Sequence, residues 1–158
     1  MYFVPALAGL GAPHWDQYVR GTIIGLTRGT TAGHIAHATL EGIADQVHDV
    51  VKVVEADVGA ALRELRVDGG VSRSDFLMQF QADVLNVPVI RPQMAELTSR
   101  GAALLAGLVT GFWRELAALS ALPRAEKVFD PQMPLSQRAR LLDGWHAAVY
   151  RSLDWERR

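Results

Sequence analysis

The sequence predicts an α/β fold, and three observations lead to this prediction. The chain has 158 residues, 49% of them hydrophobic. This composition is enough to bury one sizeable core, but the chain is too short for two full domains. Several short runs rich in apolar and β-branched residues are bounded by glycine or proline, as strands are. Segments with helical periodicity separate those runs. We therefore expect a single domain over residues 1–158, with strands alternating with helices.

The N-terminal part predicts two short strands joined by a glycine-rich loop. The first strand is expected over Val4 to Leu10, which is apolar and extended before glycines break it. The loop carries His14 and Trp15. A second strand is expected over Thr22 to Leu26, a β-branched run bounded by glycines.

The longest predicted helix begins after an N-cap at Thr31 and ends before Gly59. Its periodicity is that of an amphipathic helix with one apolar face. The residues expected on that face are Ile35, Thr39, Ile43, Val47, Val50 and Val54. The polar residues that lie largely between them are Glu41, Asp45, His48, Asp49 and Lys52.

The centre of the chain predicts a strand, a glycine turn and a helix. After a short helix or turn over Ala60 to Glu64, an apolar run from Leu65 to Val67 indicates a buried strand. The pair Gly69-Gly70 follows, and an apolar-periodic helix runs from Phe76 to Leu85. Paired glycines allow positive φ and close approach of a ligand, and a helix start offers free N–H groups to anions. Taken alone, such a turn is more often only a tight connection.

The C-terminal third predicts one more strand and two helices. Val87 to Ile90 indicates a short strand, and Pro88 places it at a strand start or a sheet edge. Thr98 can cap a helix in which Gly101 and Gly107 imply close packing against a neighbour, because glycine inside a helix costs about 1 kcal/mol relative to alanine. Phe112 and Trp113 close this helix. A loop with Pro123, Pro131 and Pro134 leads to a terminal amphipathic helix over Leu135 to Leu153.

Charge and composition exclude several classes of partner. The formal net charge is −1, from 16 basic and 17 acidic residues in no long block, so we expect no nucleic acid and no anionic membrane surface as a partner. No apolar stretch approaches the roughly 20 residues of a membrane span. The absence of cysteine removes disulfides, thiolate metal sites and cysteine nucleophiles, and favours a cytoplasmic protein.

Two other site hypotheses can be raised and set aside. His34, His37 and Glu41 recur at steps of three and four, which could place metal ligands on one helix face, but a solvated polar face is the simpler interpretation. Ser72 and Asp68 could join a histidine in a hydrolase triad, yet no G-x-S-x-G elbow exists. Neither a Walker A loop nor a G-x-G-x-x-G fingerprint is present. We therefore assign no metal site and no catalytic residue to this chain.

Longer motifs carry a family resemblance. Gly21-x-Ile23-x-Gly25-Leu26, followed after seven residues by His34-Ile35-x-x-Ala38-Thr39-Leu40-Glu41, resembles the second signature of the carbohydrate kinases that include glycerol kinase, xylulokinase and gluconokinase. Three further segments look like the glycerol kinases among them: Gly9 to Trp15 with Arg20-Gly21, Arg66 to Gly70, and Phe76 to Gln79. The resemblance runs from Phe3 to about Trp155.

The resemblance implies a fold and a nucleotide site. These kinases close two domains of the actin–hexokinase type, which is ribonuclease H-like, over a cleft, so the chain would be the later part of the second, ATP-binding domain, incomplete at its N-terminal side. ATP or ADP, with Mg²⁺, would bind at Gly69 and Gly70, where Gly70 matches a glycine whose backbone contacts the nucleotide. Ser74 falls where glycerol kinases often have a nucleotide-binding asparagine, and serine has a shorter reach.

The same resemblance places the remaining machinery outside this sequence. The catalytic aspartate, the glycerol contacts and the phosphate loop would lie before Met1, so the expected function is that of the ATP-binding part of a glycerol kinase, inactive alone. Its partners would be the missing N-terminal domain and, only through that domain, glycerol. Alternatives are another sugar kinase of the family and a non-catalytic nucleotide-binding or regulatory module.

An apolar strand begins directly after Met1, and we expect the strands that would pair with Val4 to Leu10 and Thr22 to Leu26 to be absent. Both features favour truncation over an evolved module. A split gene and the oligomeric state, a homo-oligomer included, are left open.

Overall fold

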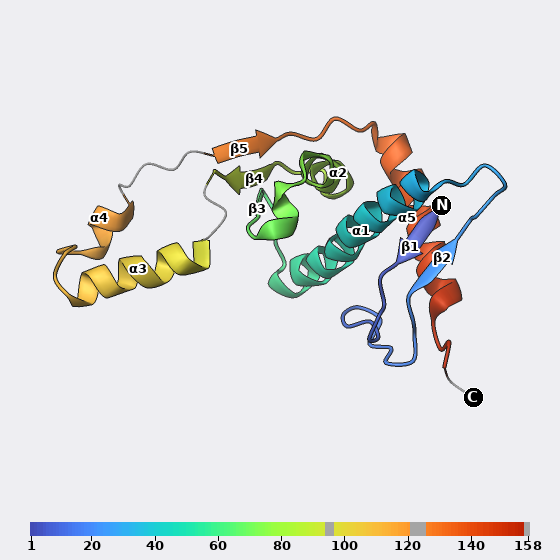
Figure 1. Cartoon of the computed structure of the whole chain (residues 1–158), viewed down its shortest axis with the longest axis horizontal. Coiled ribbons are helices and arrows are strands. Elements are labelled where there is room, and N and C mark those ends of the chain that lie inside the picture. Colours follow the sequence, from blue (N-terminus) through green and yellow to red (C-terminus); the bar gives the residue numbers. More distant parts are fainter. Residues whose placement is uncertain (94–96, 121–125, 157–158) are drawn as a thin grey trace.

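The computed structural model describes residues 1–93, 97–120 and 126–156, and Figure 1 shows how the elements are arranged. In chain order these are β1 (Tyr2–Val4), β2 (Thr22–Ile24), α1 (Ala32–Val58), β3 (Leu65–Arg66), the 3₁₀ turn η1 (Gly70–Arg73), α2 (Asp75–Leu85), β4 (Val89–Pro92), α3 (Leu97–Val109), α4 (Leu116–Ser120), β5 (Glu126–Phe129) and α5 (Leu135–Ser152). Strands alternate with helices, which confirms the α/β class. The expected loop proline Pro123 lies outside the described residues.

The first two strands form a separate antiparallel ribbon. Tyr2 lies opposite Ile24 and Val4 opposite Thr22. The expected strand over Val4 to Leu10 is wrong, because β1 ends at Val4: Pro5 follows directly and has no N–H to continue the ladder. The expectation that these two strands lack pairing strands is wrong in that they pair with each other.

The second sheet has the order β3-β4-β5, with β3 parallel and β5 antiparallel to β4. Since β4 is central, Pro88 does not mark a sheet edge; it precedes β4, and its carbonyl accepts a hydrogen bond from the N–H of Leu65 at 2.9 Å. The edge strand β5 falls where the sequence predicted a loop. Only Phe129 in it is buried among the residues with described side chains, so β5 lacks a strong apolar pattern.

Both predicted ends of α1 are confirmed. The hydroxyl of Thr31 accepts from the N–H of His34 at 3.4 Å, and His34 Nδ1 accepts from the N–H of Thr31 at 3.1 Å, so the two form a reciprocal cap. At the other end Gly59 takes φ 70° and donates to the carbonyl of Glu55 at 2.9 Å. The segment 60–64 that follows has a bend at Ala60 and no helix or turn, so the short helix or turn expected there is wrong.

The buried side of α1 differs from the predicted apolar face. Its buried residues are Ala38, Gly42, Ala44, Asp45, His48 and Asp49, whereas Val50 and Val54 are exposed. The physical reason is the close approach of β1, since a Cβ on Gly42 would overlap the carbonyl oxygen of Phe3. Small and polar residues therefore occupy the side of α1 on which the other elements pack.

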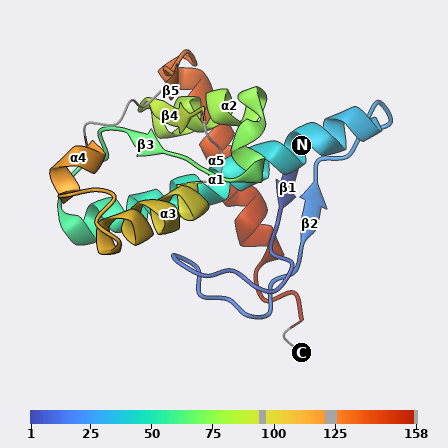
Figure 2. The same cartoon turned by 60° about the vertical axis from the view of Figure 1, so that its left-hand side comes forward.

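Two hydrophobic clusters flank α1. One joins α1 to α2 and the β3-β4-β5 sheet and is centred on Leu77, Phe80 and Val89. The other joins β1 and the loop after it to α5, around Val4, Val19 and Trp145. Figures 1 and 2 both place the ribbon of β1 and β2 toward one end of α1 and the second sheet with α2 toward the other.

Helices α3 and α4 lie on the left of Figure 1, away from α1, α2 and α5, and α3 has no buried residue. Helix α3 begins before Thr98, so that residue is not its cap. A Cβ on Gly107 would lie 2.6 Å from the Trp113 indole, which confirms close packing there, but a Cβ on Gly101 would meet no atom within 4 Å. Helix α4 and strand β5 were not predicted. No helix among the described residues is long and apolar enough to cross a membrane.

Candidate functional site

The predicted glycine turn joins β3 to α2. Gly69 has φ 89° and ψ 177°, a conformation that essentially only glycine adopts. Gly70 begins the 3₁₀ turn and has no positive φ, so the expected left-handed backbone is found at the first glycine only. The Ser72 hydroxyl donates to the carbonyl of Gly69 at 2.7 Å and closes the turn. The buried Ser72 is thus a structural residue of the turn.

The backbone of this turn faces open space. A Cβ added to Gly69 or to Gly70 would meet no heavy atom of the described part of the chain within 4 Å. The next residue, Val71, has an exposed side chain (58%). Packing against residues 1–93, 97–120 and 126–156 requires neither glycine, so an approaching ligand could contact the backbone directly.

Ser74 is the N-cap of α2. Its hydroxyl accepts from the N–H of Leu77 at 3.3 Å, and its own N–H donates to the carbonyl of Val71 at 3.2 Å. The neighbouring residues Ser72 and Asp75 do not cap α2, because the Ser72 hydroxyl closes the turn and Asp75 pairs with cations. Ser74 thus has a structural role as a helix cap, while its nucleotide contact stays a prediction.

Cations from the sheet hold the turn in place. Arg91 on β4 donates to the carbonyl of Ser72 at 2.7 Å and to one oxygen of Asp75 at 2.7 Å. Lys127 on β5 donates to the other oxygen of Asp75 at 2.5 Å. The hydrogen bond from Lys127, and then that from Arg91, lowers the pKa of Asp75. On the other side of the turn, Asp68 accepts from the N–H of Leu97 at 3.3 Å and caps the start of α3.

Replacing Ser74 with alanine should lower the free energy of unfolding by about 1 kcal/mol, because the cap of α2 is lost. Replacing it with asparagine, which also caps, should leave stability nearly unchanged. If Ser74 also bonds the nucleotide, the alanine variant loses one neutral hydrogen bond. That loss should raise the Michaelis constant for ATP roughly two- to twelvefold. Melting curves of both variants, and the Michaelis constant for ATP after each variant is combined with a separately expressed kinase first domain, separate the two roles; lower stability with unchanged ATP dependence would defeat the ligand role.

The histidines of the set-aside metal hypothesis already have local partners. His34 is part of the α1 cap, and His37 Nδ1 lies 3.3 Å from Glu41 Oε1. His34, His37 and Glu41 line a pocket of about 320 Å³ at the start of α1. Met1, Ala38 and residues between Gly25 and Thr30 complete its lining. Burial raises the pKa of Glu41, an effect that exceeds the lowering by His37.

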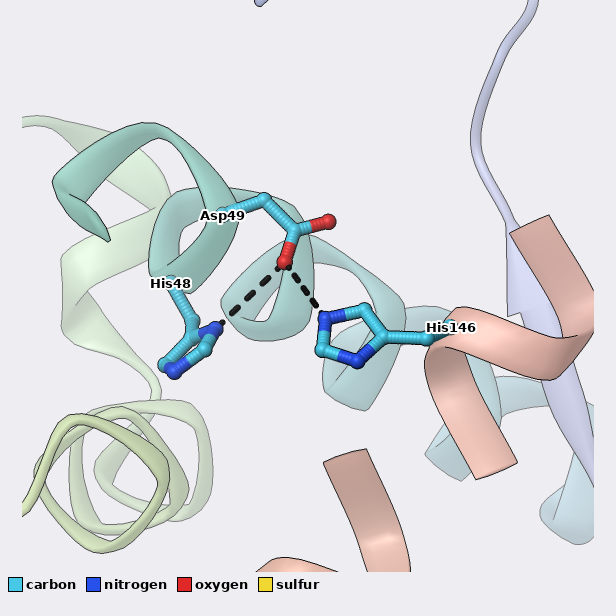
Figure 3. Close-up of side chains that lie close together, drawn as sticks. All are labelled: His48, Asp49 and His146. Atoms are coloured by element: carbon cyan, nitrogen blue, oxygen red, sulfur yellow. Dashed lines mark hydrogen bonds and ion pairs between the residues drawn. The ribbon is translucent and has the colours of Figure 1, made fainter. Parts of the chain in front are cut away.

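Sequence reasoning missed a second polar cluster, centred on the buried Asp49. Its Oδ1 lies 3.1 Å from His146 Nε2 and 3.4 Å from His48 Nδ1, as Figure 3 shows. Its Oδ2 accepts from Trp145 Nε1 at 2.8 Å and lies 3.5 Å from His14 Nε2. Burial alone would raise the pKa of Asp49, but the hydrogen bonds from His48, Trp145 and His146 lower it to about 2. The sequence carries no local signal for this cluster, since His146 lies 97 residues from Asp49.

One turn earlier on α1, Asp45 is buried at 2% exposure, and its Oδ1 has no hydrogen-bond partner among the residues that the structure describes. Burial raises the pKa of this carboxyl to about 8, and the charges of Glu41 and Asp49 add to the effect. At neutral pH these shifts favour a neutral carboxylic acid at Asp45 and an ionised carboxylate at Asp49, one helical turn apart.

Comparison with known proteins identifies the relatives of this chain. Residues 1–109 match the model of the C-terminal domain of the FGGY family of carbohydrate kinases. Glycerol kinase from Dechloromonas aromatica is 57% identical over 98% of the chain and 31% of its own length.

Among solved structures, Plasmodium falciparum glycerol kinase with ADP superposes with a TM-score of 0.85 and 40% identity, covering 96% of this chain and 30% of that one. A xylulose kinase from Rhodospirillum rubrum gives a TM-score of 0.72 and 29% identity, covering 95% of this chain and 30% of that one. The chain thus spans about a third of the length of the relatives it matches. These matches confirm the expected actin–hexokinase-type fold and the resemblance that predicted it.

Proposed function

Because the chain belongs to the FGGY family of carbohydrate kinases, we propose that it forms the nucleotide-binding side of an enzyme that transfers the γ-phosphoryl group of ATP to glycerol. The observation that carries the proposal is the open backbone face at Gly69 and Gly70, between a strand and a capped helix. ADP is bound in the Plasmodium falciparum relative. In this chain the nucleotide would lie against the turn, with Gly70 in backbone contact and Ser74 nearby.

Sequence identity favours glycerol over a sugar as the phosphoryl acceptor. The glycerol kinase of Dechloromonas aromatica is 57% identical to this chain, whereas the structurally similar xylulose kinase is 29% identical. A stand-alone binding or regulatory module would not need to retain such similarity over 98% of its length. The acceptor contacts themselves are expected in a first domain, which we propose as the partner of this chain.

The chemistry divides between the two parts. Phosphoryl transfer depends on positioning and on charge stabilisation around the phosphates, so each half of a cleft is insufficient alone. Mg²⁺ would accompany ATP, held chiefly by the phosphates, and we assign no residue of this chain to it. A cytoplasmic location stays a prediction from the absence of cysteine.

Complementation tests the proposal. The purified chain with Mg-ATP and glycerol should form no glycerol 3-phosphate above a no-protein control, since it supplies no acceptor contact or general base. Adding the separately expressed first part of Dechloromonas aromatica glycerol kinase should restore turnover, and that enzyme's own C-terminal part is the matched positive control. Turnover by the chain alone would contradict the division of the site. Failure to restore turnover, when the matched part succeeds, would contradict the proposed role.

A further inference from the structure

The cluster around Asp49 has no part in the proposed kinase function, and its geometry suggests another use. We propose that His48 Nδ1, Asp49 Oδ1 and His146 Nε2 bind a divalent transition-metal ion, for which Zn²⁺ is the natural probe. The three ligand atoms lie within 4.8 Å of one another and come from two helices, α1 and α5. The bound ion would tie these helices together where they cross.

The spacing of the ligand atoms fits such an ion. A tetrahedral centre with bonds of about 2.0–2.1 Å separates neighbouring ligand atoms by roughly 3.3 Å. Asp49 Oδ1 lies 3.1 Å from His146 Nε2 and 3.4 Å from His48 Nδ1. Figure 3 shows both rings turned toward this one oxygen. The two imidazole nitrogens lie within 4.8 Å of each other, and ring rotations that bring them to about 3.3 Å would complete the ligand set.

The rest of the cluster positions the carboxylate. Trp145 Nε1 donates to Asp49 Oδ2 at 2.8 Å, and His14 Nε2 lies 3.5 Å from the same oxygen. These contacts fix the orientation of the carboxylate through its second oxygen, and leave Oδ1 to face the two imidazoles. Metal-binding carboxylates typically have such supporting hydrogen bonds, whose loss weakens affinity about 10- to 100-fold.

An ion could reach this site from solvent. The side chain of His146 is 52% exposed, whereas those of His48 and Asp49 are 8% and 6% exposed. The buried ligands lie on α1 and the exposed one closes the site from α5, so water can complete the coordination on the open side. Two imidazoles and one carboxylate favour Zn²⁺ or Co²⁺ over Mg²⁺, which prefers oxygen ligands. The Mg²⁺ that accompanies ATP should therefore not compete.

Titration of the metal-stripped full chain with Zn²⁺ tests the site. We expect one ion per chain by calorimetry, undiminished by excess Mg²⁺. His146→Ala should weaken binding at least about tenfold, as expected for loss of a direct ligand. The matched control is His37→Ala, which removes an exposed histidine from α1 outside the cluster and should not change affinity.

A spectroscopic measurement identifies the ligands independently of the fold. Co²⁺ in place of Zn²⁺ should give the intense visible absorption of a four-coordinate ion, and His146→Ala should abolish or shift it. Circular dichroism with a chelator present checks that the variant keeps its helices. Absence of stoichiometric Zn²⁺ uptake, or equal affinity in the two histidine variants, would overturn the proposal and leave the cluster as a hydrogen-bond network only.

Discussion

Replacing Gly70 with valine should raise the dissociation constant for ATP by about 5- to 150-fold in the complemented enzyme, while the chain still folds. The fold should tolerate the change because Gly70 has no positive φ and a Cβ there meets no atom of the described residues within 4 Å. The loss would come from the ligand side, where a branched side chain would occupy the space that the nucleotide needs. Overpacking of this kind costs about 1–3 kcal/mol. Calorimetric titration with ATP measures it.

Two control variants separate this steric effect from strain and from the substitution itself. Gly11→Val makes the same change at another exposed, open position far from the turn, and should leave ATP affinity unaltered. Gly69→Ala should instead destabilise the fold by about 1–3 kcal/mol, since φ 89° with ψ 177° is strained for any side chain. An unchanged ATP affinity in a folded Gly70→Val chain would mean that the turn is only a tight connection.

The turn could be predicted from sequence because its signals are local. A glycine pair between a strand-like and a helix-like run predicts a tight turn of the backbone. The caps Thr31 and Gly59 likewise act within a few residues of their own positions. Strand β5 and helix α4 gave no comparable signal, because β5 is held by pairing with β4 and α4 is five residues long. Their structure depends on neighbours that a local pattern does not record.

The buried polar stripe of α1 shows a different limit. Periodicity predicts that an amphipathic helix buries its apolar face, but here Gly42 admits the β1 backbone and Asp49 accepts hydrogen bonds from α5. Asp49 and His146 are 97 residues apart, so no spacing rule joins them. The cluster exists because α1, α5 and the loop that carries His14 meet at this point, and only the tertiary fold brings them together.

Replacing Asp45 with asparagine should make the chain more stable relative to wild type as pH rises. In the folded chain burial raises the pKa of this carboxyl to about 8, with Glu41 and Asp49 adding to the effect, whereas its unfolded value is about 3.9. Between pH 4 and 8 the folded state thus holds a proton that the unfolded state has released. Because folding then binds more protons, wild-type stability falls with rising pH through this window and levels off above the folded pKa.

Asparagine removes this titration but keeps the size of the side chain. Any fixed cost of its buried amide is the same at all pH values, so the prediction concerns how the stability difference changes with pH. Between pH 5 and 8 the difference in unfolding free energy should shift in favour of the variant by at least about 1.4 kcal/mol, the equivalent of one pKa unit. Denaturant unfolding at a series of pH values, with a chelator present, measures it. Asp57→Asn removes an exposed carboxylate from the same helix and should show no such trend. Parallel pH profiles for wild type and Asp45→Asn would show that Asp45 is ionised in the folded chain and that its burial is relieved by water.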